Sequence, residues 1–84
     1  MRMKRSRYSI ISSILDICQS GANKTKIVYQ ANLNFKSVEF YMDLLIKNGM
    51  IRANPGKNII YETTKRGCDL LNHFKNIEKQ ISEL

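Results

Sequence analysis

Residues 23–49 read NKTKIVYQANLNFKSVEFYMDLLIKNG, and this stretch holds two helical patterns separated by a tight turn. The first pattern covers Lys24–Ala31, which Asn23 can cap, and the second covers residues 35–48. The turn between them reads Asn-Leu-Asn, which suits a tight connection because asparagine tolerates positive φ and caps helices well. We expect Leu33 to fill the gap between the two helices. Two helices joined by so short a turn predict a helix-turn-helix.

Further elements are predicted on both sides of this motif. Residues 7–19 repeat apolar residues at helical spacing, and Gly21 is expected to end that helix in the left-handed conformation. Residues 50–54 and 58–63 read as two short strands joined by the turn signal Pro55-Gly56-Lys57. A hairpin directly after the third helix is the wing of a winged helix-turn-helix. We therefore predict an α+β fold, mostly α, with three helices, a β-hairpin wing and a long C-terminal helix.

The last helix is predicted over residues 65–84, with Thr64 as its cap, as Ser6 caps the first. Five of its apolar residues recur at spacings of four, three, four and three, which is the seam of a coiled coil. They are Leu70, Phe74, Ile77, Ile81 and Leu84. Such a seam pairs with a second copy or packs on the chain's own first helix. The predicted organisation is a flexible basic arm over 1–6, a winged domain over 7–64, and a dimerisation helix over 65–84.

Composition points to a polyanionic partner. The 84 residues include 14 lysines and arginines against 7 acidic residues, a formal charge of +7, with 43% hydrophobic residues. One packed domain with so large a positive excess favours nucleic acid. The start of the chain has the basic residues of a signal peptide, but serines and Asp16 interrupt the apolar stretch that follows, and no run is long enough to span a membrane. We expect a cytoplasmic, nucleoid-associated protein.

The search for catalytic chemistry is negative. His73 is the single histidine of the sequence and is expected at the surface or at an interface of the last helix. Cys18 and Cys68 sit in apolar helical patterns and are expected to be buried free thiols. The sequence has no Gly-rich phosphate loop, metal-ligand spacing or nucleophile motif. We therefore expect a protein that is not an enzyme and has no cofactor, no metal and no small-molecule substrate.

Three segments carry a resemblance to a known family. They read KTKIVYQANLN at 24–34, LLIKNGMI at 44–51 and TTKRGCDLL at 63–71. Together they resemble small archaeal winged-helix DNA-binding proteins, the family of ten-kilodalton chromosomal proteins and the predicted transcriptional regulators related to them. The resemblance covers roughly residues 6 to 84. It implies double-stranded DNA as the partner and a homodimer that pairs through an antiparallel coiled coil of the last helix.

The candidate DNA contacts lie on the elements that would flank one groove. The expected set is Lys36, Ser37 and Phe40 on the third helix, Lys24, Thr25 and Lys26 at the start of the second, Arg52, Lys57 and Asn58 on the wing, and Lys65 and Arg66 after it. Phe40 either meets a thymine methyl or packs under the wing or a partner chain. Glu39 and Asp43 share the outward face of the third helix, where carboxylates would repel phosphate. Either they face away from the DNA, or Glu39 accepts a hydrogen bond from a cytosine amine, or binding depends mainly on the arm and the wing. Backbone contacts are therefore expected to be more secure than base reading.

The predicted function is DNA binding by a winged-helix dimer, as a transcriptional regulator or as an architectural chromosomal protein. Two alternatives stay open at this point. The outward acids and Phe40 would also suit a protein-interaction module, and the same basic face would suit RNA.

Overall fold

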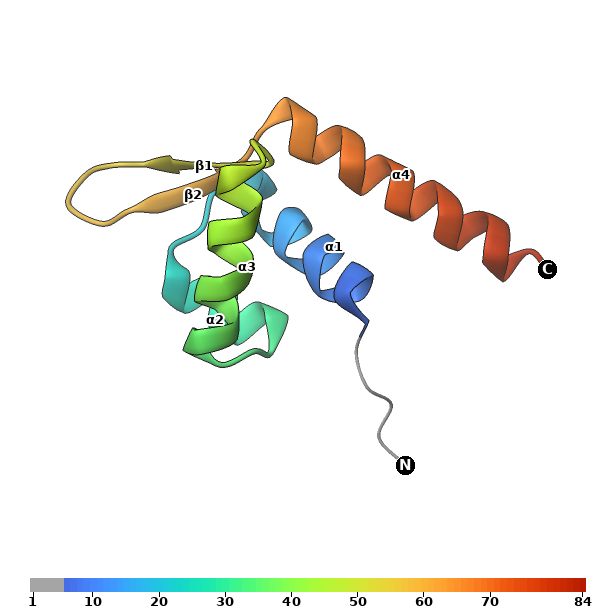
Figure 1. The fold of residues 1–84 in the computed structure, drawn as a ribbon, viewed down its shortest axis with the longest axis horizontal. Helices are drawn as coiled ribbons and strands as arrows, with labels where there is room; N and C mark the ends of the chain where they lie inside the picture. Colours follow the sequence, from blue (N-terminus) through green and yellow to red (C-terminus); the bar gives the residue numbers. More distant parts are fainter. Residues whose placement is uncertain (1–5) are drawn as a thin grey trace.

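The structure, a computed structural model, describes residues 6–84 (Figure 1). Its elements are α1 (Arg7–Ile17), a 3₁₀ turn (Cys18–Ser20), α2 (Lys24–Ala31), α3 (Phe35–Lys47), β1 (Ile51–Asn54), β2 (Ile60–Thr63) and α4 (Lys65–Ser82). Figure 1 shows α1, α2 and α3 forming the body, the β1–β2 hairpin leaving it on one side and α4 on the other. The predicted mostly helical winged helix-turn-helix is confirmed. The arm predicted over 1–6 lies, except for Ser6, outside the described residues.

Each helix begins where a polar side chain can cap it. The caps are Ser6 for α1, Asn23 for α2, Asn34 for α3 and Thr64 for α4. Each side-chain oxygen accepts a hydrogen bond from the backbone N–H three residues later, over 2.8–3.2 Å. These bonds satisfy amides that have no partner within the helix. The predicted starts of all four helices are therefore confirmed.

The turn between α2 and α3 also matches its prediction. Asn32 adopts the left-handed conformation, with φ 55° and ψ 51°. The Leu33 amide donates to the Val28 carbonyl over 3.1 Å, and the half-buried Leu33 side chain packs against the core. The turn thus closes without a glycine.

The connection from α1 to α2 differs from its prediction. The α-helix ends at Ile17 and continues as a 3₁₀ turn. Gly21 has a positive φ of 86°, as expected, but its ψ of 135° is extended and not left-handed helical. The reason is the next residue, because Ala22 forms a bridge to Tyr61 with two backbone hydrogen bonds of 2.8 and 3.0 Å. The chain must therefore run extended beside the wing before α2 can start.

The wing is a two-stranded antiparallel sheet in which Ile51 faces Thr63 and Asn54 faces Ile60. Both strands are shorter than predicted. Met50 stays outside β1, and its carbonyl accepts from the Thr64 amide over 2.9 Å where α4 begins. Residues 55–59 form the loop at the tip.

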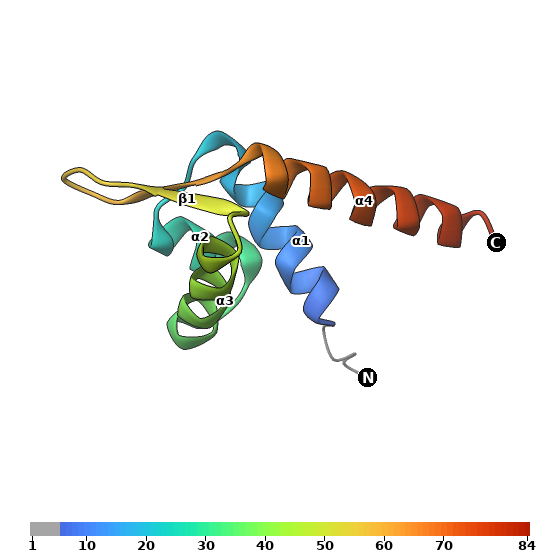
Figure 2. The same cartoon turned by 45° about the horizontal axis from the view of Figure 1, so that its top comes forward.

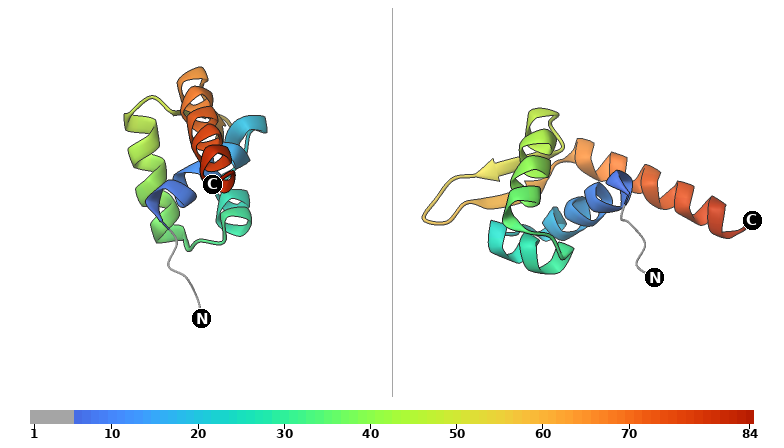
Figure 3. Two further views of the ribbon diagram at one scale, coloured as in Figure 1. Left: turned by 90° about the vertical axis from the view of Figure 1, so that its right-hand side faces the viewer. Right: turned by 60° about the horizontal axis from the view of Figure 1, so that its bottom comes forward.

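The core lies where α1, α2, α3, the wing base and α4 meet. Its largest fully buried side chains are Ile14, Leu15, Cys18, Ile27, Val38, Met42, Ile51 and Leu71. α4 contributes Leu71, which lies beside the predicted seam and not on it. The rest of α4 projects past α1, as Figures 2 and 3 show from three further directions.

Candidate nucleic-acid interface

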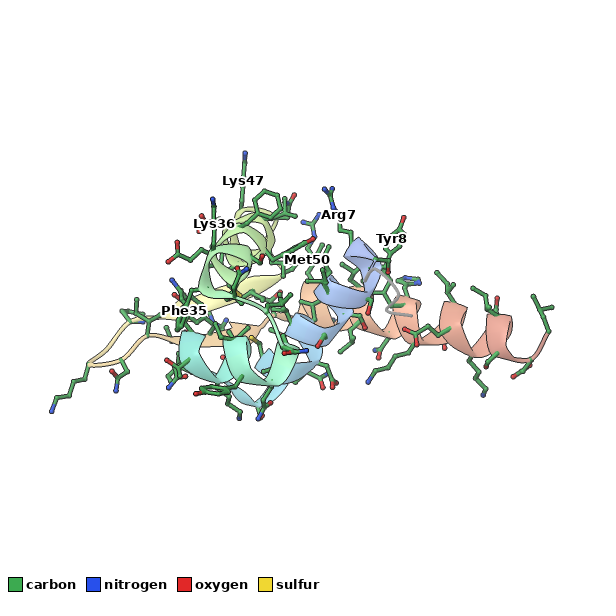
Figure 4. The ribbon with its side chains drawn as sticks, turned by 90° about the horizontal axis from the view of Figure 1, so that it is seen from below. Arg7, Tyr8, Phe35, Lys36, Lys47 and Met50 are labelled. Atoms are coloured by element: carbon green, nitrogen blue, oxygen red, sulfur yellow. The ribbon has the colours of Figure 1, made fainter. Side chains whose placement is uncertain are left out.

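α3 presents one face to the core and the opposite face to the surroundings. Val38, Met42 and Leu45 are buried. The outer face carries Lys36, Phe40, Asp43 and Lys47, all exposed and spaced four, three and four residues apart. Figure 4 shows Lys36 and Lys47 pointing to the same side of the molecule. An exposed helix of this kind is narrow enough to enter the major groove of B-DNA.

Phe40 lies open on this face. Its side chain is 56% exposed, and its ring meets the ring of the neighbouring Tyr41 edge to face at 5.2 Å between centroids. In the single chain it is therefore not covered by the wing. Contact with a thymine methyl and packing under a partner chain remain as the expectations for it. Ser37 lies half-buried beside it, with its amide held by the Asn34 cap.

One of the two acids on α3 has a partner. The Glu39 carboxylate lies 3.6 Å from the ammonium group of Lys24, in the first turn of α2. Within residues 6–84 no ion pair involves Asp43. Part of the negative charge on the outer face is thus turned toward α2, and Asp43 keeps its charge in the middle of the face.

The start of α2 brings the other two expected residues to the surface. Thr25 and Lys26 are both exposed.

The two cysteines are free thiols. Burial raises the pKa of the Cys18 thiol to about 11, while the nearby charge of Lys26 lowers it by a smaller amount. Cys18 is therefore the buried, neutral free thiol that was expected, and Cys68 is a free, half-buried thiol.

On the wing, the predicted contacts divide into two groups. The Arg52 guanidinium donates to the Glu62 carboxylate over 2.8 Å, and the Asn54 amide donates to the same oxygen over 3.3 Å. These two bonds, with the charge of Arg52, lower the pKa of Glu62. Lys57 and Asn58 lie exposed in the loop at the tip. The wing is thus close to neutral at its base and positive at its tip.

Lys65 and Arg66 occupy the first turn of α4 and are exposed. A Cβ at Gly49 would lie 3.9 Å from Cδ of Arg66, so the stem of this arginine passes the end of α3. The structure therefore brings Arg66 to the junction of α3, the wing and α4.

Two exposed cations on the same side of the molecule as Lys36 were missing from the expected set. Arg7, at the start of α1, and Lys47, at the end of α3, point to the same side of the molecule as Lys36 (Figure 4). A sequence signal for Arg7 exists, because a cation at the first position of a helix opposes the helix dipole. Its direction, to the same side as Lys36 and Lys47, depends on tertiary packing, which the helical pattern of α1 does not specify.

The predicted seam of α4 divides into two parts. Leu70 and Phe74 are half-buried, and the Phe74 ring meets Tyr8 of α1 edge to face at 5.7 Å. Ile77, Ile81 and Leu84 are 52%, 62% and 104% exposed. A groove of about 460 Å³ runs between α1 and this part of α4, and Ser6, Tyr8, Ser9, Phe74, Ile77, Glu78 and Ile81 line it.

The remaining chemistry of the described chain is sparse. His73 is exposed on α4 in a shallow polar hollow with Asp69, Asn72 and Asn76. Residues 6–84 contain no cluster of three histidine, cysteine or acidic side chains that could hold a metal ion. Within the same range, none of the helices combines the length and the apolar character needed to cross a membrane.

Comparisons of sequence place the chain among known proteins. A family model described as winged helix-turn-helix matches residues 4–82. An uncharacterized protein of Methanocaldococcus jannaschii is 42% identical over 70 residues, which span 82% of this chain and 69% of that protein. A second uncharacterized protein of the same organism is 34% identical over 80 residues, which span 94% of this chain and 36% of that protein. The resemblance to small archaeal winged-helix proteins is thus confirmed.

Comparisons of structure agree with this. Sso10a-2, a DNA-binding protein from Sulfolobus solfataricus, matches with a TM-score of 0.86 at 28% identity, over 94% of this chain and 84% of that one. ZitR from Lactococcus lactis, solved in complex with DNA, matches with a TM-score of 0.71 at 12% identity, over 99% and 60% of the two chains. The second likeness shows a shared fold alone.

Proposed function

The chain belongs to the winged helix-turn-helix family, and on that basis we propose that it binds double-stranded DNA through the outer face of α3, with the wing and the start of α2 on the flanking backbone. The observation that carries the proposal is the exposed face of α3, with Lys36 and Lys47 at its two ends and Phe40 between them. The proposed role is binding and not catalysis. Its place of action is chromosomal DNA.

The likeness to Sso10a-2 supports this proposal, because that protein is a DNA-binding protein and the match extends over nearly the whole described fold. The charge of this chain supports it as well. The cations of α2, α3, the wing tip and the α4 start outnumber the acids near them, and two of those acids already pair with cations of this chain.

The proposed contacts fall into two kinds. Phosphate contacts are assigned to Lys24, Thr25, Lys26, Lys36, Lys57, Asn58, Lys65 and Arg66, and contact with base edges is assigned to Ser37 and Phe40. Arg52 and Lys24 are given smaller shares, because Glu62 and Glu39 already pair with them. Most of the affinity therefore comes from the backbone, and the protein serves as a regulator of modest sequence preference or as an architectural protein.

We assign the free part of α4 to homodimerisation. The exposed Ile77, Ile81 and Leu84 continue the seam begun by Leu70 and Phe74, and the groove against α1 extends it sideways. In an antiparallel pair of α4 helices centred on Ile77, the end of α4 in one chain lies beside the start of the seam in the partner chain. A second helix in that place would cover the exposed isoleucines and fill the groove. The proposed organisation is then a winged DNA-binding part over 7–64 and a dimerisation helix over 65–84.

A salt titration of duplex binding tests the function directly. The full chain is titrated into a fluorescent DNA duplex at several salt concentrations, and the logarithm of the association constant is plotted against that of salt. We expect a steep negative slope of about 0.9 per neutralised phosphate, because each contact releases counterions. A slope near zero would refute the proposal.

Two further arms of the same experiment separate the alternatives. Duplex RNA is used as a competitor, and preference for RNA over DNA would assign the basic face to RNA instead. A charge-reversed variant, Lys36→Glu with Lys57→Glu, is expected to lose DNA binding. Unchanged DNA binding in this variant would exclude α3 and the wing as the contact surface.

A further inference from the structure

We infer that α1 takes part in DNA binding: Arg7 binds the DNA backbone on the side of α3 that lies away from the wing, and Lys47 binds the backbone at the end of α3. The inference rests on the proposed function. It adds a contact region outside the helix-turn-helix and the wing.

The first observation is the direction of three side chains. Arg7, Lys36 and Lys47 project to the same side of the molecule from two different helices (Figure 4). All three are exposed. We call the surface formed by Arg7, Lys36 and Lys47 the Arg7 face.

The second observation is that the Arg7 face keeps its charge. In the part of the chain that the structure describes, ion pairs join Lys24 to Glu39, Arg52 to Glu62 and Lys75 to Asp16. None of the three cations of the Arg7 face takes part in such a pair, and Asp43 is the one acid between Lys36 and Lys47 on α3 that also stays outside these pairs. Three positive charges thus stand against the one negative charge of Asp43. The net positive charge of the Arg7 face is therefore available to a phosphate of the DNA backbone.

The third observation concerns span. Lys36 and Lys47 are eleven residues apart on α3, which is about 16 Å along a helix at ~1.5 Å per residue. The major groove of B-DNA is about 12 Å wide. Cations at the two ends of α3 can therefore reach the phosphates on the two edges of the groove that α3 would enter.

The last observation is the position of α1 relative to the wing. Figure 1 and the right-hand view of Figure 3 both show the start of α1 on the side of α3 opposite to the hairpin. Lys57 in the wing loop and Arg7 thus lie on opposite sides of α3. A duplex seated against α3 would meet a cation on each side, and this arrangement fixes the orientation of the protein on the DNA.

The test is the salt slope of single charge variants of the full chain. Arg7→Gln and Lys47→Gln are each expected to reduce the slope by about 0.9 per protomer, since one phosphate contact is lost. Arg7→Lys keeps the charge and should restore the wild-type slope. The matched control is Lys75→Gln, a cation paired with Asp16 on a different part of the surface, and its slope should equal that of the wild type.

The outcomes separate the inference from the proposed function. A steep wild-type slope with an unchanged slope in both Arg7→Gln and Lys47→Gln would overturn the inference and leave the function standing. A wild-type slope near zero would overturn both. Circular dichroism and thermal unfolding of each variant show that it is folded, so that a lower slope reports a lost contact.

Discussion

Gly67, the third residue of α4, sits where that helix passes over the end of the α3–β1 connection. A Cβ at this position would overlap the Met50 carbonyl oxygen and lie 2.7 Å from Cγ2 of Thr63. The same Met50 carbonyl accepts the Thr64 amide, so it cannot move without breaking the start of α4. Only a glycine therefore fits at position 67 without displacing its neighbours.

We expect Gly67→Ala to lower the free energy of unfolding by about 1–3 kcal/mol or more, because overpacking forces the backbone to shift. Urea unfolding measures the change. Gly56→Ala in the wing loop is the control, since its Cβ would meet nothing nearer than the Asn58 carbonyl oxygen at 3.6 Å. Equal stability losses in the two variants would contradict the explanation.

Glu39 allows a test of how an acidic residue on α3 affects DNA binding. If it only pairs with Lys24, Glu39→Gln removes a charge that repels phosphate and frees the ammonium group for DNA. We expect affinity for duplex DNA to rise roughly threefold, because exposed charges a few ångströms apart interact by about 1 kcal/mol or less. Fluorescence anisotropy at fixed salt measures this. A fall in affinity confined to one preferred sequence would instead show that Glu39 accepts a hydrogen bond from a base.

Among the elements, the wing has a built-in dependence on pH. The hydrogen bonds from Arg52 and Asn54 lower the pKa of Glu62 in the folded state, so its carboxylate stabilises the wing at pH values above the ordinary value of 4.5. That contribution is lost as the pH falls through the lowered pKa. We expect wild type to lose more stability than Glu62→Gln between pH 6 and pH 3, measured by urea unfolding. Equal losses in the two proteins would show that these bonds do not stabilise the wing.

The four helix starts share an unusual charge pattern. None of the four helices has an acidic residue in its first turn. Arg7, Lys24, Lys26, Lys36, Lys65 and Arg66 stand in those turns instead. Cations at helix starts oppose the helix dipole, so the pattern costs stability unless an anion binds there.

We therefore expect Thr25→Glu, in the first turn of α2, to stabilise the fold while weakening DNA binding. The gain should be about 0.3–1 kcal/mol, or roughly 1–8 °C in Tm for a chain of this size. The loss of affinity should be about tenfold, because the new carboxylate faces phosphate. Calorimetry and anisotropy measure the two effects, with Thr25→Gln as the uncharged control. Stronger DNA binding by the Glu variant would remove the start of α2 from the interface.

The same elements show what could be foreseen from the sequence. The helix starts were predictable because each depends on one polar residue and its own amides, as at Asn23 and Thr64. The extended ψ of Gly21 was not, because Tyr61, forty residues later, imposes it. The pairing of Glu39 with Lys24 and the shared direction of Arg7 and Lys36 were missed for the same reason. Both depend on how different helices are placed relative to one another, which no local pattern encodes.

At the scale of the whole molecule, the two halves of α4 lie in different surroundings. Its first half is bound to the core through Leu71, which is fully buried. Its second half leaves the body with Ile77, Ile81 and Leu84 exposed. A contiguous exposed apolar surface of this kind is typical of an interaction site. The sequence showed the regular apolar spacing of the seam. It did not show that Phe74 contacts α1 while Ile77, Ile81 and Leu84 are exposed, because all the seam residues have the same spacing.

We expect wild type to sediment as a dimer and Ile81→Lys as a monomer, because a buried seam position cannot hold a lysine without a partner for its charge. Asn72→Lys, an exposed residue on the opposite side of α4, is the control and should remain dimeric. Because Ile81 is 62% exposed in the single chain, its replacement should leave the monomer folded. The wild-type Tm should rise with protein concentration, and that of Ile81→Lys should not. Wild type that sediments as a monomer at every concentration would show that the seam does not pair, and each winged domain would then have to bind DNA alone.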